Sequence, residues 1–156
     1  MVIQRWQSLL LLVAAIMMGC FTFCSLGQVQ TERFTFDFTC IGFSYVGEAT
    51  DGAPSGMYLS TWYAFALSLT TAILLVIDIF LFKNLEIQKK VCMVCLLMVI
   101  ASAATVGSLG CCVIYGGSIS WSSLALSPVL AAISVILAYS CMQRDHRKLK
   151  AVDRIR

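Results

Sequence analysis

The sequence contains few charged residues and a single histidine, His146. Asp, Glu, Lys and Arg make up 12% of the 156 residues, whereas soluble domains carry about 25%. The chain therefore lacks the polar residues that would cover the surface of a water-soluble globule. It also lacks a glycine-rich phosphate loop, and one histidine is too few for most hydrolase and transition-metal chemistry. From the sequence we expect no catalytic residue, no bound metal and no cofactor.

Hydrophobic residues are abundant instead, at 60% of the chain with a mean hydropathy of +0.88. They concentrate in four apolar runs, at residues 9–26, 57–82, 91–115 and 124–142. A helix needs roughly 20 apolar residues to cross a bilayer, so each run predicts one span. We expect an all-α membrane protein, in which one membrane domain of residues 1–156 folds as a four-transmembrane-helix bundle.

The first apolar run also has features of a secretory signal, because a short basic segment precedes it. Met17 and Met18 fit a cleavage site poorly, and the apolar run continues past Cys20. We therefore interpret residues 9–26 as an uncleaved membrane helix.

Residues 27–56 form the longest segment that is not apolar. Within it, residues 34–39 alternate strictly between phenylalanine and a polar residue, which is the pattern of a β-strand with one apolar face. The sequence Asp-Gly-Ala-Pro at 51–54 is typical of a turn. We expect a small β-hairpin over the ends of the helices, either as a structural lid or as an exposed edge that pairs with a partner strand.

Basic residues fall almost entirely on one side of the four-span arrangement. Only Arg33 lies on the other side, in the loop of residues 27–56. Short loops with an excess of Lys and Arg face the cytoplasm, so both termini are predicted to be cytoplasmic and the β-hairpin to lie in the first extracytoplasmic loop. The ten basic residues on the cytoplasmic side are Arg5, Lys83, Lys89, Lys90, Arg144, Arg147, Lys148, Lys150, Arg154 and Arg156.

One acidic residue, Asp78, falls inside an apolar run, and an ionisable group there is a candidate functional residue. Lys83, Lys89 and Lys90 follow it in the loop between the second and third spans. We interpret these four residues as a polar cluster at the cytoplasmic hairpin that acts as a structural clamp or a docking surface. The other hypothesis, a proton or cation relay, needs further polar partners within the spans, where the sequence offers only hydroxyl groups.

The eight cysteines lie mostly in or beside the apolar runs, where cysteine acts as a small packing residue. Cys92 and Cys95 nevertheless have the spacing of a redox motif, and the two lysines before them favour thiolate. A redox role requires exchange with an outer pair, for which Cys24 and Cys40 are candidates. The predicted cytoplasmic position of Cys92 and Cys95 argues against that role, because cytoplasmic thiols stay reduced.

Two further patterns concern contacts with other molecules. Ala103, Gly107 and Cys111 recur every four residues in the third run, as small residues do where membrane helices pack closely. The basic tail of residues 143–156 carries apolar residues at helical spacing, which predicts anchoring on anionic lipid headgroups. We expect no nucleic acid partner.

Three segments together resemble one known family. They are residues 1–9, MVIQRWQSL, residues 79–88, IFLFKNLEIQ, and the closing residues 151–156, AVDRIR. In their order, and with the four apolar runs, they are similar to the domain-of-unknown-function family of small four-span inner-membrane proteins from the Bacteroidota lineage. The resemblance covers the whole chain and implies a Gram-negative inner membrane, with a periplasmic loop rich in phenylalanine. It implies no activity, so no functional residue follows from it.

These observations favour a non-catalytic role. We expect an accessory or assembly subunit of a membrane complex, located in the bacterial inner membrane and in contact with a membrane-protein partner. The alternatives are a membrane thiol-disulfide oxidoreductase and a small transporter or channel subunit.

Overall fold

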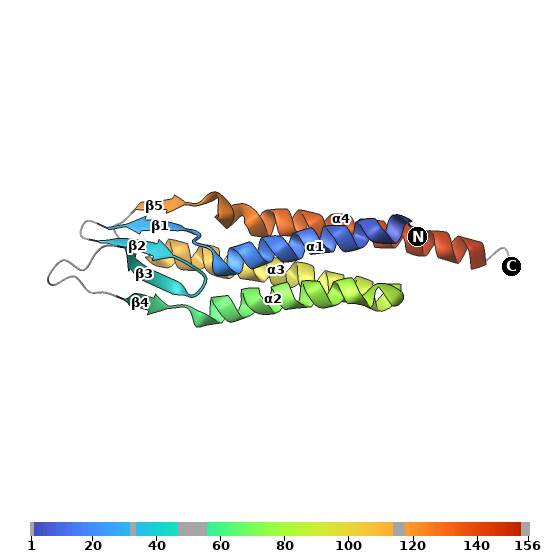
Figure 1. Cartoon of the computed structure of the whole chain (residues 1–156), viewed down its shortest axis with the longest axis horizontal. Helices are drawn as coiled ribbons and strands as arrows, with labels where there is room; N and C mark the ends of the chain where they lie inside the picture. Colours follow the sequence, from blue (N-terminus) through green and yellow to red (C-terminus); the bar gives the residue numbers. More distant parts are fainter. Residues whose placement is uncertain (1, 32–33, 47–55, 114–117, 154–156) are drawn as a thin grey trace.

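The computed structural model of the protein describes residues 2–31, 34–46, 56–113 and 118–153. It consists of four long helices that lie side by side and a small β-sheet at one end (Figure 1). Both termini lie at the end opposite the sheet, as does the turn between the second and third long helices (Figure 1). The helices are α1 Val2–Phe23, α2 Trp62–Phe80, α3 Leu85–Val113 and α4 Ser127–Asp153, with two 3-10 turns, η1 Leu81–Lys83 and η2 Ser123–Leu126.

Each long helix packs against two others, α1 and α3 both contacting α2 and α4. The interior faces carry small and polar side chains at spacings of three and four residues, so they form one stripe along each helix. On α2 this stripe consists of Ala64, Ser68, Thr71, Leu75 and Asp78.

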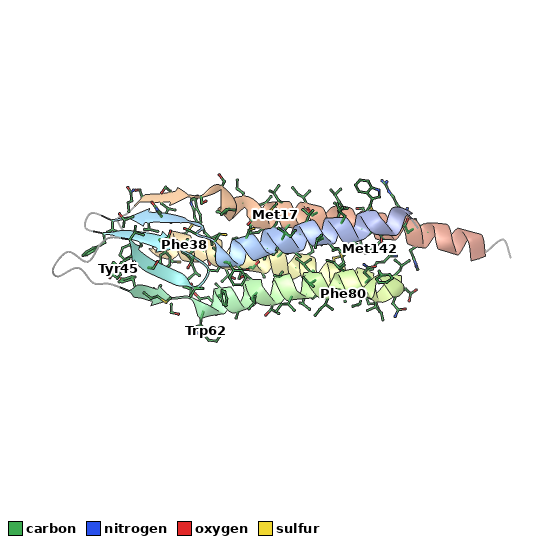
Figure 2. The ribbon with its side chains drawn as sticks, in the orientation of Figure 1. Met17, Phe38, Tyr45, Trp62, Phe80 and Met142 are labelled. Atoms are coloured by element: carbon green, nitrogen blue, oxygen red, sulfur yellow. The ribbon has the colours of Figure 1, made fainter. Side chains whose placement is uncertain are left out.

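The outward faces of the same helices are more apolar than the inward faces. On α2 the exposed side chains include Ile73, Val76, Ile77 and Phe80, and Figure 2 shows Trp62 and Phe80 pointing away from the other helices. This polarity is the reverse of a soluble protein, where large apolar residues lie inside.

The hydroxyl groups inside the helical part are satisfied locally. Ser68 donates to the backbone oxygen of Phe65 at 3.0 Å, and Ser102 donates to that of Val99 at 2.8 Å. Because these side chains are short and make their hydrogen bonds within their own helix, neighbouring helices pack closely without leaving these hydroxyl groups unpaired.

Four helical segments are long and apolar enough to cross a membrane, which confirms the multi-span composition predicted from the sequence. They are Trp6–Phe23, Trp62–Phe80, Leu85–Cys112 and Ser123–Arg147. The second helix begins later than the predicted residue 57, because residues 57–60 form a strand. The predicted basic tail of residues 143–156 continues α4 without a break as far as Asp153.

The sheet has five antiparallel strands in the order β4-β3-β2-β1-β5. The predicted alternating segment forms β2, so a small antiparallel element is confirmed, but it is larger than a hairpin. The additional strand β5 comes from the connection between α3 and α4 and pairs with the free edge of β1. The strands are β1 Gly27–Gln30, β2 Thr35–Phe38, β3 Gly42–Val46, β4 Met57–Ser60 and β5 Ser118–Trp121.

One face of the sheet is apolar and joins the helical part. The strand register places Phe38, Phe43 and Trp121 on that face, and the rings of Phe38 and Phe43 stack with centroids 4.5 Å apart. Trp121 also lies against α3, because a Cβ atom added at Gly110 would come within 2.6 Å of its ring. A larger residue at position 110 would therefore have to displace the Trp121 ring where α3 meets the sheet.

Candidate functional site at the α2–α3 turn

Asp78 lies in the last turn of α2 and is fully buried, with 0% of its surface exposed. Its backbone oxygen accepts hydrogen bonds from the amide of Leu81 and from Nε2 of Gln88, the latter at 3.3 Å. Neither of its carboxylate oxygens has a hydrogen-bond partner among the described residues. A buried carboxylate without a donor is costly, so this residue marks an unusual position in the fold.

Helix α3 supplies the side chains around Asp78. Gln88, Cys92 and Cys95 lie on one face of α3 because they are four and three residues apart, and each is buried with at most 1% exposed. The thiol of Cys92 is directed to the backbone oxygen of Val135 on α4, at 3.7 Å. These side chains lie near Asp78, because Gln88 bonds to its backbone oxygen and the two cysteines share the buried face of Gln88. We call Asp78, Gln88, Cys92 and Cys95 the buried polar cluster.

The lysines predicted to accompany Asp78 form no hydrogen bond with its carboxylate among the described side chains. Lys90 is exposed and Lys89 is half-buried, and neither donates a hydrogen bond to the carboxylate of Asp78. The side chain of Lys83 lies outside the described residues. Among the described side chains, the structure therefore joins Asp78 to Gln88 and the thiols rather than to the lysines.

Gln88 was not among the residues predicted from the sequence. The available signal was its position one turn before Cys92 on the same face of a helix. Its Nε2 bonds to the backbone oxygen of Asp78, so the side-chain amide of Gln88 connects α3 to α2 across the turn. Its Oε1 has no hydrogen-bond partner among the described residues.

The cysteines form no disulfide in the structure. All eight are free thiols. Cys92, Cys95 and Cys40 are buried and Cys24 is half-buried. In the described part of the chain no group of three or more His, Cys, Asp or Glu side chains has a geometry suited to a metal ion.

Cys40 sits where the turn between β2 and β3 meets α1 and α2. Its thiol donates to the backbone oxygen of Phe21 at 3.1 Å. Burial raises the pKa of this thiol to about 11, with a hydrogen bond to Ser68 acting in the opposite direction. Reactive cysteines have lowered pKa values, so Cys40 has the properties of a structural residue.

A second polar contact closes the same end of the helical part. Gln7 on α1 is buried and donates a hydrogen bond from Nε2 to the carboxylate of Asp145 on α4. No sequence pattern indicates this pair, because the two residues belong to opposite ends of the chain.

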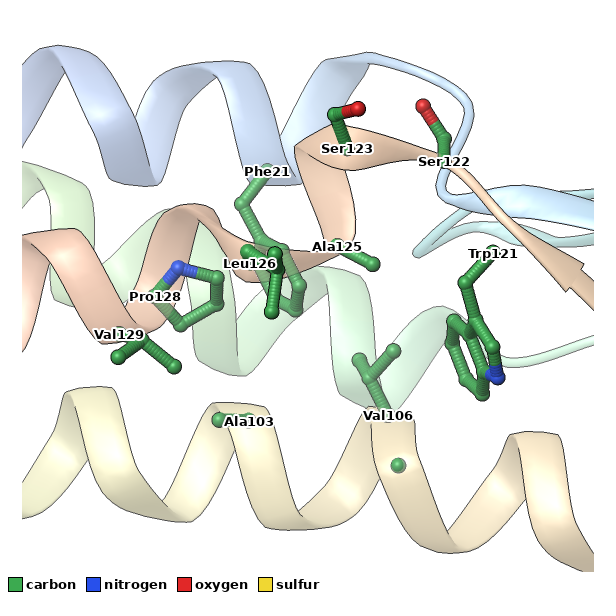
Figure 3. Close-up of a pocket in the computed structure, with 11 residues that line it drawn as sticks. Phe21, Ala103, Val106, Trp121, Ser122, Ser123, Ala125, Leu126, Pro128 and Val129 are labelled. Carbon is green, nitrogen blue, oxygen red and sulfur yellow. The ribbon is translucent and has the colours of Figure 1, made fainter.

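An apolar groove of about 510 Å³ lies at the other end, between α3 and the start of α4 (Figure 3). Ala103 and Val106 of α3 form one wall, and Leu126, Pro128 and Val129 form the facing wall (Figure 3). The complete lining is Phe21, Ala103, Val106, Gly107, Trp121, Ser122, Ser123, Ala125, Leu126, Pro128 and Val129.

Ala103 and Gly107 of α3 line this groove. A Cβ atom added at Gly107 would have no neighbour within 4 Å, and Cys111 is exposed. The sequence predicted a close packing face at Ala103, Gly107 and Cys111. The structure leaves Gly107 and Cys111 without a helix of the same chain packed against them.

The fold defines a class of protein with four helices of membrane-spanning length and a five-stranded antiparallel sheet at one end. Within that class, the chain belongs to the family described as Domain of unknown function (DUF4293), whose model matches residues 3–155. This membership confirms the resemblance to a domain-of-unknown-function family. No curated protein matches the chain.

Proposed function

We propose that the protein is a non-catalytic accessory or assembly subunit of a membrane complex. Its four helices cross the bacterial inner membrane as a four-helix bundle, and the groove between α3 and α4 receives a transmembrane helix of a larger partner. The observation that carries this proposal is the groove itself, which Ala103 and Gly107 line and where a Cβ atom added at Gly107 would meet no neighbour within 4 Å.

The polarity of the helices supports insertion in a membrane. Side chains such as Leu97, Ile100 and Leu137 leave half or more of their surface exposed. Each would lose about 1.5–3 kcal/mol of favourable burial in water, and contiguous apolar surface of that kind marks a membrane or protein contact. A bilayer solvates these faces, while the small and polar residues remain inside.

The distribution of charge supports the orientation. Both termini and the α2–α3 turn lie at one end of the molecule (Figure 1), and ten of the eleven basic residues belong to those segments. By the positive-inside rule, this end is cytoplasmic and the sheet lies in the periplasm. The helical extension of α4 then carries the basic tail to the cytoplasmic surface, where we expect it to contact anionic lipid headgroups.

A helix is a better occupant of the groove than a lipid chain. Membrane helices associate where small residues allow their backbones to approach, and the spacing of four residues between Ala103 and Gly107 suits such an approach. A flexible acyl chain adapts to bulky and small side chains alike, so it gives no reason for small residues at these positions. Leu126 and Val129 on the facing wall are more than half exposed, so the groove is accessible from the side of the bundle.

The test is to fill the groove and measure complex size. We expect the wild-type protein, extracted from native membranes in mild detergent, to migrate in a complex larger than the monomer. Ala103→Leu should shift at least half of it to the monomer, because the added side chain occupies the space that the partner helix needs. The matched control is Ala104→Leu, one residue further along α3, because Ala104 is exposed and does not line the groove.

Two results would contradict the proposal. One is a wild-type protein that is monomeric in every mild extraction. The other is a large complex that both Ala103→Leu and Ala104→Leu leave intact. Co-purification of another protein is not sufficient support, because the proposal also requires that Ala103→Leu release that protein.

A further inference from the structure

Three oxygen atoms in the buried polar cluster need a donor. They are Oδ1 and Oδ2 of Asp78 and Oε1 of Gln88, and none has a hydrogen-bond partner among the described residues. Both side chains are at least 99% buried. Buried polar groups in proteins are almost always paired. Three unpaired acceptors on two contacting residues therefore indicate a donor or a cation that the described residues do not supply.

The cluster is also negative in electrostatic terms. An ionised carboxylate cannot stay buried without compensation, because the low-dielectric surroundings do not replace its hydration. Asp78 also lies in the last turn of α2, and the C-terminus of a helix carries a partial negative charge of its own. Both contributions favour a positive charge at this position.

The described groups that face Asp78 do not supply that charge. From α3, Nε2 of Gln88 bonds to the backbone oxygen of Asp78, and the thiol of Cys92 is directed to α4. The thiol of Cys95 is buried beside them and is uncharged unless it loses its proton, which would add a negative charge.

One polar pair joins α1 and α4 at this end. Figure 2 places Met142 of α4 at the same end as Phe80, and Asp145 follows Met142 by about one helical turn. Asp145 accepts a hydrogen bond from Gln7 of α1, and it is acidic, so this pair adds no positive charge.

We propose that Asp78 and Gln88 form a buried site for one small monovalent cation taken up from the cytoplasmic end of the bundle. Two sources share this chemistry. A proton converts the carboxylate into a carboxylic acid, whose O–H becomes a donor to a neighbouring oxygen. A sodium ion is coordinated directly by the carboxylate and amide oxygens.

The donor set favours a hard cation with a single charge. Carboxylate and amide oxygens prefer hard cations, and the one carboxylate of Asp78 balances one positive charge. The described residues also hold no group of three or more His, Cys, Asp or Glu side chains suited to a transition metal. The site is one turn from the end of α2, so a cation enters from the α2–α3 turn without crossing the apolar centre.

The experiment measures the charge state of Asp78 directly. The full chain, labelled with ¹³C at the aspartate carboxyl carbons, is placed in lipid nanodiscs at pH 7. Its NMR spectrum is recorded in choline chloride and then in sodium chloride at equal ionic strength. The signal of Asp78 is the one missing from Asp78→Asn, and Asp37→Asn on the sheet serves as the control for assignment.

Two outcomes support the site and identify its ligand. A carboxylic acid signal that is the same in both salts assigns a proton. A signal that moves with a saturable dependence on sodium concentration assigns sodium. A carboxylate signal in choline chloride that sodium leaves unchanged would overturn the proposal, because the compensating charge would then come from the chain itself.

Stability supplies a second readout that does not depend on the spectrum. Asp78→Asn replaces the occupied site by a neutral group of the same shape, so the variant should unfold at the same temperature as the wild type or higher. For sodium, wild-type stability should rise with its concentration and that of Asp78→Asn should not. A variant that unfolds at a clearly lower temperature, together with a salt-independent wild type, would count against a cation site. Neither measurement requires a partner helix, so the site and the groove are tested separately.

Discussion

At the scale of single residues, burial determines how readily the Cys40 thiol ionises. Cys40 is enclosed by the backbone of Phe21 and by Thr61, whose hydroxyl donates to the backbone oxygen of Cys40 at 3.0 Å. Water does not solvate a thiolate in that position, which is why the pKa of Cys40 rises from 9.0 to about 11. The residue joins the sheet to the helices and is unsuited to thiol exchange at neutral pH.

This shift predicts a pH dependence of stability. Between pH 9.0 and about 11 the unfolded chain loses the Cys40 proton while the folded protein keeps it, so the free energy of unfolding falls as pH rises. The loss is roughly 2 kcal/mol across this window, at about 1.4 kcal/mol for each unit of pKa. Below pH 9.0 the thiol is neutral in both states and has no such effect.

Denaturant unfolding of the wild type and of Cys40→Ala at pH 8, 9, 10 and 11 measures this contribution. The stability difference between the two proteins should shrink above pH 9, because the alanine variant lacks the titrating group. A difference that stays constant from pH 8 to 11 would show that the Cys40 thiol ionises as readily in the folded protein as in the unfolded chain.

The sequence identifies some residues of the candidate site and not others. Asp78 was identified because an acid within an apolar run is rare and costly. Its real neighbour, Gln88, was not, because glutamine at a helix surface is common and only the three-dimensional turn brings its amide to Asp78. Gln7 and Asp145 were missed for the same reason, since 138 positions separate them in sequence.

At the scale of elements, the sheet depends on one close approach between strands. Gly42 begins β3, and a Cβ atom added there would collide with the backbone oxygen of Leu59 on β4. Backbone atoms cannot move aside as a flexible side chain can, so only glycine allows β4 to pair at this point. The hydrogen bond from Thr61 to Ile41, at 2.8 Å, ties the same region to the start of α2.

We therefore predict that Gly42→Ala separates β4 from β3 and lowers the free energy of unfolding by about 2–4 kcal/mol. Gly19→Ala is the control, because Gly19 lies within α1 and a Cβ atom there meets nothing within 4 Å. That variant should be stabilised by up to about 1 kcal/mol, the helix preference of alanine over glycine. Thermal unfolding in the same detergent compares the two, and equal stability of both variants would contradict the proposed strand contact.

The helices and strands differ in how well they can be predicted from the sequence. The helices were predicted because long apolar runs have few other structures available in a membrane. Strand β2 was predicted from the strict alternation of phenylalanine and polar residues at 34–39. Strands β4 and β5 were not predicted, because the residues of β4 belong to the apolar run that continues into α2, and β5 pairs with a strand about 90 residues earlier.

At the scale of the whole molecule, the two outer connections are joined by the sheet. Strand β1 follows α1 and pairs with β5, which precedes α4, and the amide of Ser122 donates to the backbone oxygen of Leu26 at 2.9 Å. Strands from both connections thus form one structure over the ends of the helices. The sequence suggested a lid from the first connection alone.

The groove between α3 and α4 also belongs to this scale. The sequence identifies the small residues of α3 as a helix-packing face but not the helix that packs against it. In the structure, Ala103 and Gly107 line a groove whose facing wall includes Pro128 and Val129 of α4 (Figure 3). Periodicity along one helix does not reveal which neighbour, if any, fills the space beside it.

The central claim is that the chain crosses the membrane four times and has its basic end in the cytoplasm. The measurement is labelling of single cysteines by a membrane-impermeant maleimide in spheroplasts, in a variant with the native cysteines replaced. Gln28→Cys, exposed on β1, should react in intact spheroplasts, whereas Lys90→Cys, exposed beside the α2–α3 turn, should react only after permeabilisation. A fluorescent protein fused after Arg156 of the otherwise unmodified chain should fluoresce, as it does when it folds in the cytoplasm. Labelling of Lys90→Cys from outside, or of both positions from the same side, would contradict the account.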